Sequence, residues 1–116
     1  MGMTVHPLVQ TWIDRLVDVD VEGLLDLYDV QARMNTAHES WEGHDEIADG
    51  LRLVQKYLRG VQVEELVAAS GDPAHVQFET TVRGVLGRAR IHHDWHLGGD
   101  RIHRHTMTVL HHDKTA

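Results

Sequence analysis

Alternation of apolar and polar residues is clearest in the last third of the chain, from Gly87 to Leu110. Two runs of about ten residues flank Gly98-Gly99-Asp100, a pattern that predicts two long strands joined by a tight turn. Because side chains alternate across a strand, each run has two faces. One face of this hairpin carries Ala89, Ile91, His93, Trp95 and Leu97, then His103, His105, Met107 and Val109. Large apolar residues mixed with histidines indicate the wall of a pocket.

Apolar residues at helical spacing occupy most of the first half. The spacing predicts a helix over residues 6–18, whose apolar positions are Leu8, Val9, Trp12, Ile13, Leu16 and Val17. Asp20 is a good N-cap for a second, short helix that extends to Tyr28. A third amphipathic helix is expected over residues 45–58, closed by Gly60.

Strand patterns occupy the other segments. Residues 32–39, 61–69 and 75–83 alternate in polarity, with a bulge or bend expected near Glu64-Glu65 and a turn at Ser40 to Gly43. The order is two helices, a strand, a helix and four strands. It predicts an α+β fold in one domain, residues 1–116, with three helices packed on one face of a curved, mostly antiparallel sheet.

Composition narrows the classes of function. The 116 residues carry a net charge of -7 with histidines neutral and show no basic stripe, which argues against a nucleic-acid partner. The absence of cysteine excludes thiolate catalysis and cysteine-ligated zinc. No apolar run approaches the ~20 residues of a membrane span and no secretory signal is visible, so we expect a cytoplasmic protein with no membrane partner.

Four short motifs occur in a characteristic order. They are Val9-Gln10-x-Trp12, Asp20-x-x-x-Leu24-Leu25-x-Leu27-Tyr28, Trp41-x-Gly43-x-x-x-Ile47 and Gly99-Asp100-Arg101-Ile102. Together they make the chain, over roughly residues 6–110, resemble the NTF2-like superfamily and its SnoaL-like group. The resemblance implies a cone-shaped sheet around a pocket that holds a small apolar molecule.

The resemblance also implies which side chains face that pocket. The expected catalytic residues are His93, His105 and Asn35. The expected substrate-binding residues are Trp12, Tyr28, Arg33, Phe78, Thr80, Ile91, Trp95, His103 and Met107. Further inward-facing positions are Leu16, Ala37, Leu51, Tyr57 and Val82.

Two known mechanisms of the superfamily do not transfer to this chain. Ketosteroid isomerases use a tyrosine and two acids, where the similar positions here are Trp12, Asn35 or Thr36, and His93. The limonene-type epoxide hydrolases share the first-strand Asn35, but Thr80, Val82 and Met107 stand where their remaining polar residues would be.

His93 and His105 are the candidates for proton transfer, because a neutral imidazole accepts or donates a proton near pH 7. Same-face residues on adjacent antiparallel strands lie within ~5 Å of each other, or ~7–8 Å on the diagonal. With Asn35 and the Trp12 indole orienting the substrate, the pattern predicts a cofactor-independent isomerase, cyclase or dehydratase acting on an apolar or polyketide-like molecule. The alternative is a non-catalytic ligand-binding or dimerisation module with structural histidines.

Two further alternatives concern the hairpin faces. His93, His103 and His105 offer three imidazoles for a zinc-like ion, but no carboxylate shares their face, and we expect neither a metal nor a cofactor. The opposite face is expected to be solvated or to join two copies in a homodimer; it carries Arg90, His92, Asp94, His96, Arg104 and Thr106. A register error of one residue would instead bring His92, Asp94 and His96 into the pocket.

Overall fold

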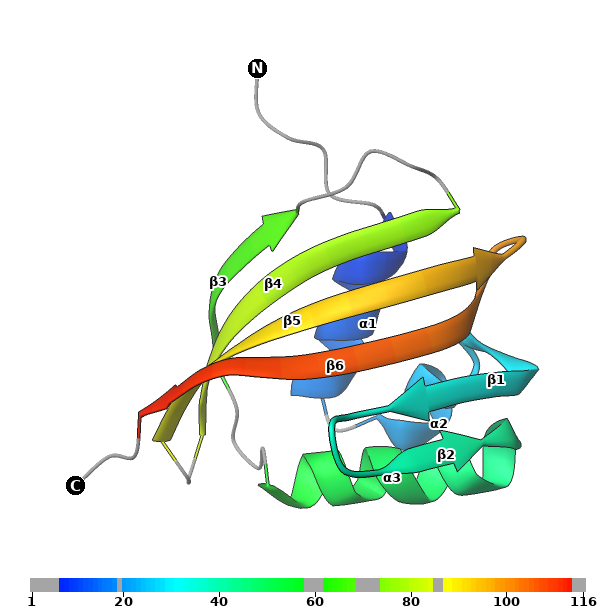
Figure 1. Cartoon of the computed structure of the whole chain (residues 1–116), viewed down its shortest axis with the longest axis horizontal. Coiled ribbons are helices and arrows are strands. Elements are labelled where there is room, and N and C mark those ends of the chain that lie inside the picture. The colour runs from blue at the N-terminus through cyan, green and yellow to red at the C-terminus, as the bar shows by residue number, and fades with distance from the viewer. Residues whose placement is uncertain (1–6, 19, 58–61, 69–73, 85–86, 114–116) are drawn as a thin grey trace.

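The computed structural model describes residues 7–18, 20–57, 62–68, 74–84 and 87–113. Over these residues the chain forms three helices and six strands (Figure 1). The helices are α1 (Pro7–Val17), α2 (Val21–Leu25) and α3 (Gly43–Tyr57). The strands are β1 (Tyr28–Asn35), β2 (Ser40–Glu42), β3 (Gln62–Ala68), β4 (His75–Gly84), β5 (Gly87–Gly98) and β6 (Arg101–Asp113). The predicted α+β class is confirmed.

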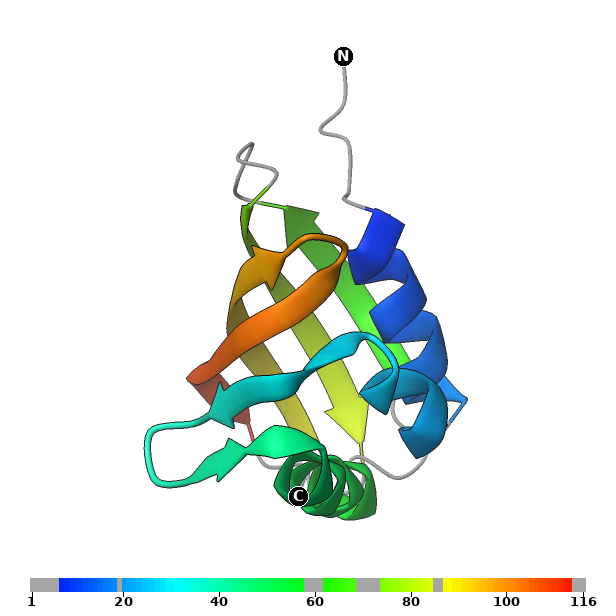
Figure 2. The same ribbon diagram turned by 90° about the vertical axis from the view of Figure 1, so that its right-hand side faces the viewer.

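All six described strands belong to one sheet with the order β2-β1-β6-β5-β4-β3. β1 runs parallel to β6 and every other described pair is antiparallel, which confirms a mostly antiparallel sheet. The sheet is curved but does not close, since β2 and β3 are its two edges (Figure 2). The β5–β6 hairpin turns at Gly99, whose φ of 68° favours a residue without a side chain.

The helices cover the concave side of the sheet. α1 lies across the open side near β3 (Figure 2), and α3 runs along β1 and β2 (Figure 1). One face of α1 is buried because Val9, Trp12, Ile13 and Leu16 recur at helical spacing. Asp20 caps α2 as predicted, its carboxylate accepting a hydrogen bond from the Gly23 N–H at 2.9 Å.

Two element assignments made from the sequence are wrong. Tyr28 begins β1 rather than ending the second helix, and Ser40–Glu42 forms the short strand β2 rather than a turn. β2 pairs with the end of β1, where Asn35 lies opposite Ser40. Three residues are too few to show alternation, so the pattern carries no strand signal there. The predicted end of the third helix at Gly60 lies outside the described residues.

Register irregularities decide which side chains face inward. The pairing of β3 with β4 shifts between Val63 and Glu65, which confirms the predicted bend. On β6, the partners of His96 and Leu97 are Arg104 and Ile102, so His103 is the extra residue of a β-bulge. The bulge leaves two successive exposed side chains before His105 turns inward.

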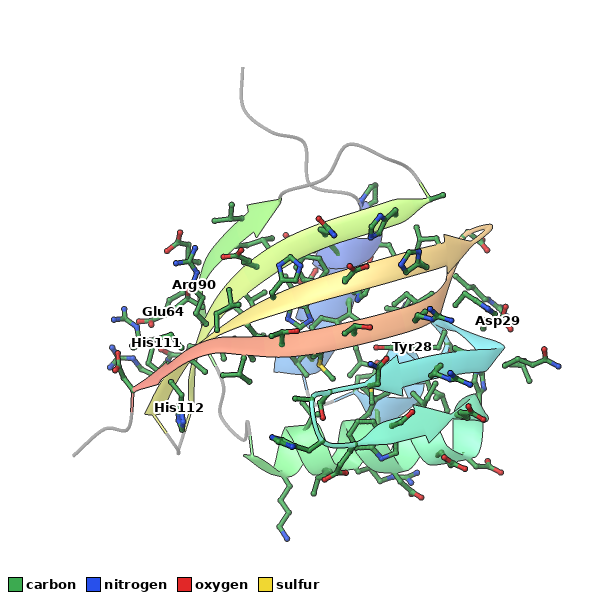
Figure 3. All side chains as sticks on the ribbon, viewed as in Figure 1. Tyr28, Asp29, Glu64, Arg90, His111 and His112 are labelled. Carbon is green, nitrogen blue, oxygen red and sulfur yellow. The ribbon has the colours of Figure 1, made fainter. Side chains whose placement is uncertain are left out.

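The core fills the half of the concave side near the start of β1. Its largest fully buried side chains include Tyr28, Phe78, Trp95, Leu24, Met34, Ile47, Leu51 and Ile102. Figure 3 shows Asp29 toward one end of the sheet and Glu64, Arg90, His111 and His112 toward the other. Among the described helices, none has the length and apolar character needed to cross a membrane.

Candidate active site

A cavity of about 470 Å³ occupies the other half of the concave side. Its walls come from α1, α3, β3, β4, β5, β6 and the loop that follows β1. The lining residues are Trp12, Ile13, Leu16, Thr36, Ala37, His38, Val54, Val63, Thr80, Val82, Ile91, His93, Met107, Thr108 and Val109. Most of these side chains are aliphatic or aromatic, so the cavity suits an apolar molecule with a few polar groups.

His93 is the buried imidazole at the wall of this cavity. It lies on β5, opposite Phe78 of β4 and Met107 of β6, and is 2% exposed. Its ring stacks on Phe78 with centroids 4.5 Å apart. Its Nε2 lies 3.2 Å from the Thr80 hydroxyl, a second polar group on the cavity wall. The stacking and the hydrogen bond hold Nε2 beside the cavity.

His105 lies directly behind His93 and does not line the cavity. Its Nε2 is 2.9 Å from Nδ1 of His93, and its Nδ1 is 2.7 Å from the Tyr28 hydroxyl. The Trp12 indole donates to the same hydroxyl at 3.1 Å. These five side chains, Thr80, His93, His105, Tyr28 and Trp12, form a continuous set of hydrogen bonds that we call the buried polar chain. It passes from the cavity wall into the core.

Protons can be ordered along this chain in either direction. In one order, Tyr28 donates to His105, His105 donates from Nε2 to His93, and His93 directs its Nε2–H toward Thr80 and the cavity. In the opposite order, Thr80 donates to Nε2 of His93, His93 donates from Nδ1 to His105, and His105 donates to the Tyr28 oxygen. The Tyr28 proton then points toward Sδ of Met34, 3.9 Å away. Nε2 of His93 is therefore either a hydrogen-bond donor or an acceptor at the cavity wall, and both imidazoles are neutral in either order.

Burial keeps every group of the chain uncharged. Burial lowers the pKa of His93 to about 3, and the charge of neighbouring His92 acts in the same direction. The pKa of His105 is lowered well below its ordinary value, first by burial and then by His93. Burial raises the pKa of Tyr28, against a smaller opposing effect of the Trp12 hydrogen bond. All three groups are neutral at pH 7.

The structure brings part of the predicted site together. Five of the predicted residues line the cavity: Trp12, Thr80, Ile91, His93 and Met107. Tyr28 and His105 lie behind them in the buried polar chain. Phe78 and Trp95 are fully buried core residues that do not line the cavity. The Trp95 indole nitrogen has no hydrogen-bond partner within the described part of the chain.

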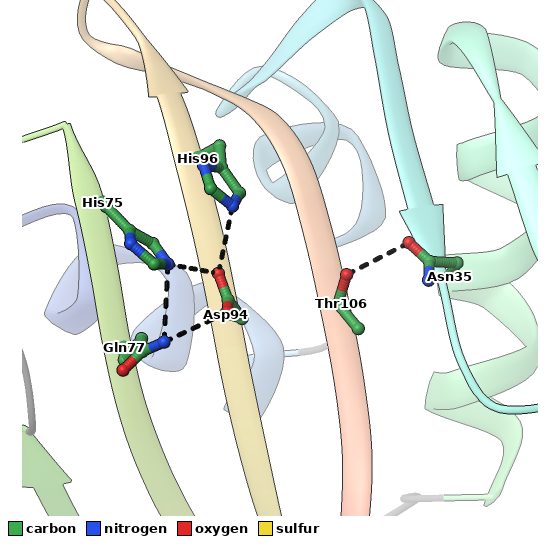
Figure 4. Close-up of polar contacts among 6 residues, drawn as sticks. All are labelled: Asn35, His75, Gln77, Asp94, His96 and Thr106. Carbon is green, nitrogen blue, oxygen red and sulfur yellow. Dashed lines mark hydrogen bonds and ion pairs between the residues drawn. The ribbon is translucent and has the colours of Figure 1, made fainter.

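Three predicted site residues lie on the outer face, and their expected inward orientation is wrong. On β1 the buried side chains are Ala32 and Met34, so Arg33 and Asn35 point outward. Arg33 forms an ion pair with Glu42, and Asn35 accepts a hydrogen bond from Thr106 at 3.2 Å (Figure 4). The physical reason is the polarity of this part of the strand, where apolar Ala32 and Met34 occupy the buried face and Met34 lies against Gly50 of α3.

His103 is the third of these residues, and the bulge accounts for its position. Its Nδ1 lies 3.6 Å from the Asp29 carboxylate at the surface. His93, His103 and His105 therefore do not come together as ligands for one zinc-like ion. On β5, His93 and Trp95 face inward, so the alternative in which His92, Asp94 and His96 line the pocket is excluded.

Several lining residues were not predicted. In a regular strand over residues 32–39, Thr36 and His38 would face away from Ala37, but they lie beyond the end of β1, where alternation no longer applies. Val63 comes from a strand whose irregular pairing hides the direction of its side chains. Of the further expected positions, Leu16, Ala37 and Val82 line the cavity, Leu51 lies in the core, and the Tyr57 side chain lies outside the described part.

No family model and no curated protein matches this sequence. Solved structures do match. An NTF2-like protein from Anabaena variabilis is 17% identical, with a TM-score of 0.81 over 99% of this chain and 100% of that chain. A Sinorhizobium meliloti protein provisionally named a polyketide cyclase is 15% identical, with a TM-score of 0.78 over 89% and 94% of the two chains.

A third structure is a Catenulispora acidiphila protein described as having a ketosteroid isomerase-like fold, solved in complex with trimethylamine. It is 13% identical, with a TM-score of 0.76 over 90% of this chain and 85% of that chain. The chain therefore has the NTF2-like, ketosteroid isomerase-like fold, as the sequence motifs predicted. Identities this low establish the fold and leave the chemistry to the site.

Proposed function

We propose that the protein is a cofactor-independent enzyme that moves a proton next to a carbonyl group of a small apolar molecule, as isomerases, cyclases and dehydratases do. One observation carries the proposal. The buried polar chain reaches the wall of an apolar cavity at Nε2 of His93 and at the Thr80 hydroxyl bonded to it. A structural hydrogen-bond network has no need to place a titratable nitrogen there.

In the proposed step, Nε2 of His93 takes a proton from the carbon next to the carbonyl. The electron pair of the broken C–H bond forms a C=C bond, and the carbonyl π electrons move to oxygen, giving an enolate. Returning the proton to a different carbon completes an isomerisation. Expelling a hydroxyl group from the neighbouring carbon completes a dehydration, with the proton leaving in water.

The lowered pKa of His93 keeps its ring neutral throughout the neutral range, and in the proton order that leaves Nε2 without hydrogen this nitrogen accepts the proton. A pKa of about 3 also makes the imidazole a weak base, so the step depends on the charge of the enolate that forms beside the imidazolium. The imidazolium that results is costly when buried alone, but the enolate forms beside it and offsets its charge. The enolate oxygen needs hydrogen-bond donors, and the Thr80 hydroxyl beside Nε2 of His93 is the candidate.

His105 and Tyr28 act as positioning residues in this proposal, because neither lines the cavity. His105 fixes which nitrogen of His93 carries the proton, since the two rings share one hydrogen bond. Tyr28 does the same for His105. The fold shared with a provisionally named polyketide cyclase is compatible with such chemistry and supports it only by analogy.

A second candidate function is a binding module for apolar molecules. The specific observation in its favour is that the two polar groups deepest in the cavity wall, His93 and Thr80, already satisfy each other. In that case the chain of hydrogen bonds serves to shape the cavity.

Exchange of substrate protons separates the two candidates. We would incubate the protein with a panel of small cyclic ketones and enones in D₂O and follow loss of the α-proton NMR signals. Saturation-transfer NMR would report binding of the same compounds. The enzyme proposal predicts accelerated exchange for at least one compound, and a decrease of about 10²–10⁴-fold in His93→Gln.

His92→Gln is the matched control, because His92 is the neighbouring residue on the outer face of β5. It should keep the exchange rate within about threefold of wild type. Compounds that bind without any exchange in the wild type would favour the binding module. Full exchange activity in His93→Gln would remove His93 as the base.

A further inference from the structure

A second group of polar side chains lies on the outer face of the sheet, on the side away from the cavity. His75 of β4 sits directly opposite His96 of β5, and Asp94 precedes His96 by two residues on the same face (Figure 4). Gln77 lies opposite Asp94 on β4. The four side chains therefore meet across one strand pair.

The contacts converge on one carboxylate oxygen. Oδ1 of Asp94 lies 2.7 Å from Nε2 of His75 and 3.5 Å from Nε2 of His96. The two imidazole rings are stacked, with centroids 4.3 Å apart and planes 13° from parallel. One donor atom from each of these three residues lies within 4.8 Å of the others.

We propose that His75, Asp94 and His96 bind one divalent transition-metal ion, with Zn²⁺ as the best match. Two imidazole nitrogens and one carboxylate oxygen form a mixed nitrogen and oxygen set of the kind that zinc accepts. A water molecule would complete a four-coordinate site, because the side chains of His75 and Asp94 are only partly buried and that of His96 is exposed.

Rotation of the two imidazole rings forms the site, because rings stacked 13° from parallel must turn before both Nε2 atoms point at one ion. Tetrahedral zinc with bonds of about 2.0–2.1 Å holds its donor atoms about 3.3 Å apart. The observed 2.7 Å and 3.5 Å separations lie on either side of this value. The strand pairing fixes the Cα positions, so only side-chain torsions must change.

Gln77 supplies support from outside the ligand set. Its amide nitrogen donates to the other oxygen of Asp94, Oδ2, at 3.1 Å. This bond orients the carboxylate so that Oδ1 faces the two imidazoles. Outer partners of this kind typically contribute about 10–100-fold in metal affinity.

A neighbouring positive charge allows a variant that should strengthen zinc binding rather than weaken it. Arg104 lies opposite His96 on β6, on the same outer face. Its positive charge repels a bound cation, so Arg104→Gln should tighten zinc binding, by roughly threefold at ordinary ionic strength. Loss of a ligand should weaken it.

Isothermal titration calorimetry of the full chain with Zn²⁺ alone, near pH 7.5, tests the proposal. We expect one site per chain, with affinity at least about 10-fold weaker in Asp94→Asn and in His96→Gln. Asp94→Asn keeps the shape of the side chain, so the fold should persist; circular dichroism would check this. Gln77→Ala should weaken binding by about 10-fold.

His111→Ala is the matched control, because His111 and Asp113 form a comparable exposed pair at 2.9 Å. It should leave the affinity unchanged. Equal weakening by His111→Ala, or wild-type affinity in both Asp94→Asn and His96→Gln, would overturn the proposal. So would the absence of a one-to-one binding phase in the wild type.

Discussion

Nδ1 of His93 lies 2.9 Å from Nε2 of His105, on adjacent strands and inside the protein. Neither ring meets a carboxylate within the buried polar chain, so nothing there compensates a positive charge. The pair therefore stays neutral, and the proton on one ring determines the free nitrogen of the other. This coupling relates the cavity wall to Tyr28, two hydrogen bonds further into the core.

The first prediction concerns stability against pH. The pKa of His93 is lowered to about 3 and that of His105 is also lowered, whereas both are near 6.5 in the unfolded chain. Below about pH 6.5 the two imidazoles bind protons in the unfolded chain but stay neutral in the folded protein. The free energy of unfolding should therefore fall as the pH drops from about 6.5 toward 3, by up to ~1.4 kcal/mol per pH unit for each histidine.

Urea denaturation at about pH 7.5 and about pH 5.5 measures this effect. Above pH 5 the carboxylates contribute little, so the comparison isolates the imidazoles. The His93→Gln and His105→Gln variants should each show a smaller pH dependence than wild type. An equal dependence in all three proteins would contradict the neutral buried pair.

The second prediction concerns the Tyr28 hydroxyl. Tyr28→Phe removes the partner of both the Trp12 indole and Nδ1 of His105. Leaving two buried polar atoms unpaired should lower the free energy of unfolding by about 1–3 kcal/mol. Denaturant unfolding measures this loss. A loss below about 0.5 kcal/mol would show that the hydrogen bonds of the buried polar chain are interrupted at Tyr28.

The same variant isolates the ionisation of Tyr28. Burial raises the pKa of this phenol, so the native protein should not form its phenolate before it unfolds in alkali. The ultraviolet difference between wild type and Tyr28→Phe should show no tyrosinate up to about pH 11. A normal titration near pH 10 would mean that the hydroxyl reaches solvent.

The third prediction concerns the cavity. Val54 of α3 lines it, and Val54→Phe adds bulk where empty space already exists. Binding of a neutral apolar dye such as Nile red should weaken at least about 10-fold, while stability should change by less than the ~1–3 kcal/mol of an overpacked core. Val30→Phe is the control, because Val30 is 63% exposed and lies outside the cavity. Equal dye binding in all three proteins would place the bound dye elsewhere.

The fourth prediction concerns Gly50 in α3. Replacing a helix-interior glycine by alanine ordinarily stabilises a helix by about 1 kcal/mol. Here a Cβ at position 50 would lie 2.7 Å from Cε of Met34 and 2.8 Å from Cδ2 of Trp41. Gly50→Ala should therefore destabilise the protein in denaturant unfolding. Asp49→Ala, at an exposed neighbouring position, should stay within about 0.5 kcal/mol of wild type. A gain in stability at position 50 would show that α3 lies further from the sheet.

Regular alternation made the inward faces of β4 and β5 predictable. Val76, Phe78, Thr80 and Val82 are buried as expected, and so are the His93 and Trp95 rings. The cavity-facing nitrogen of His93 follows from that alternation. The coupling to His105 follows because both strands of the hairpin present one face to the helices.

What the sequence did not reveal depends on contacts between distant strands. The bulge at His103 arises from the pairing of β5 with β6, and a single strand gives no sign of it. On β1, apolar Ala32 and Met34 indicate the inward face, which places Arg33 and Asn35 outward, contrary to the orientation that the resemblance implies. The meeting of His75 with Asp94 and His96 depends on the register of β4 against β5, which the pattern within either strand does not specify. The homodimer through the sheet stays a prediction.

Direct observation of the imidazole nitrogens tests whether His93 and His105 form a neutral pair at the wall of the cavity. Long-range ¹H–¹⁵N NMR distinguishes protonated from unprotonated ring nitrogens, and His93→Gln and His105→Gln assign the signals. We expect one proton on each ring at pH 7, unchanged down to about pH 5, with shifts at Nε2 of His93 when an apolar carbonyl compound binds. A doubly protonated ring at pH 6 would contradict the neutral pair. An Nε2 signal of His93 that does not shift with any bound compound would contradict its place in the site.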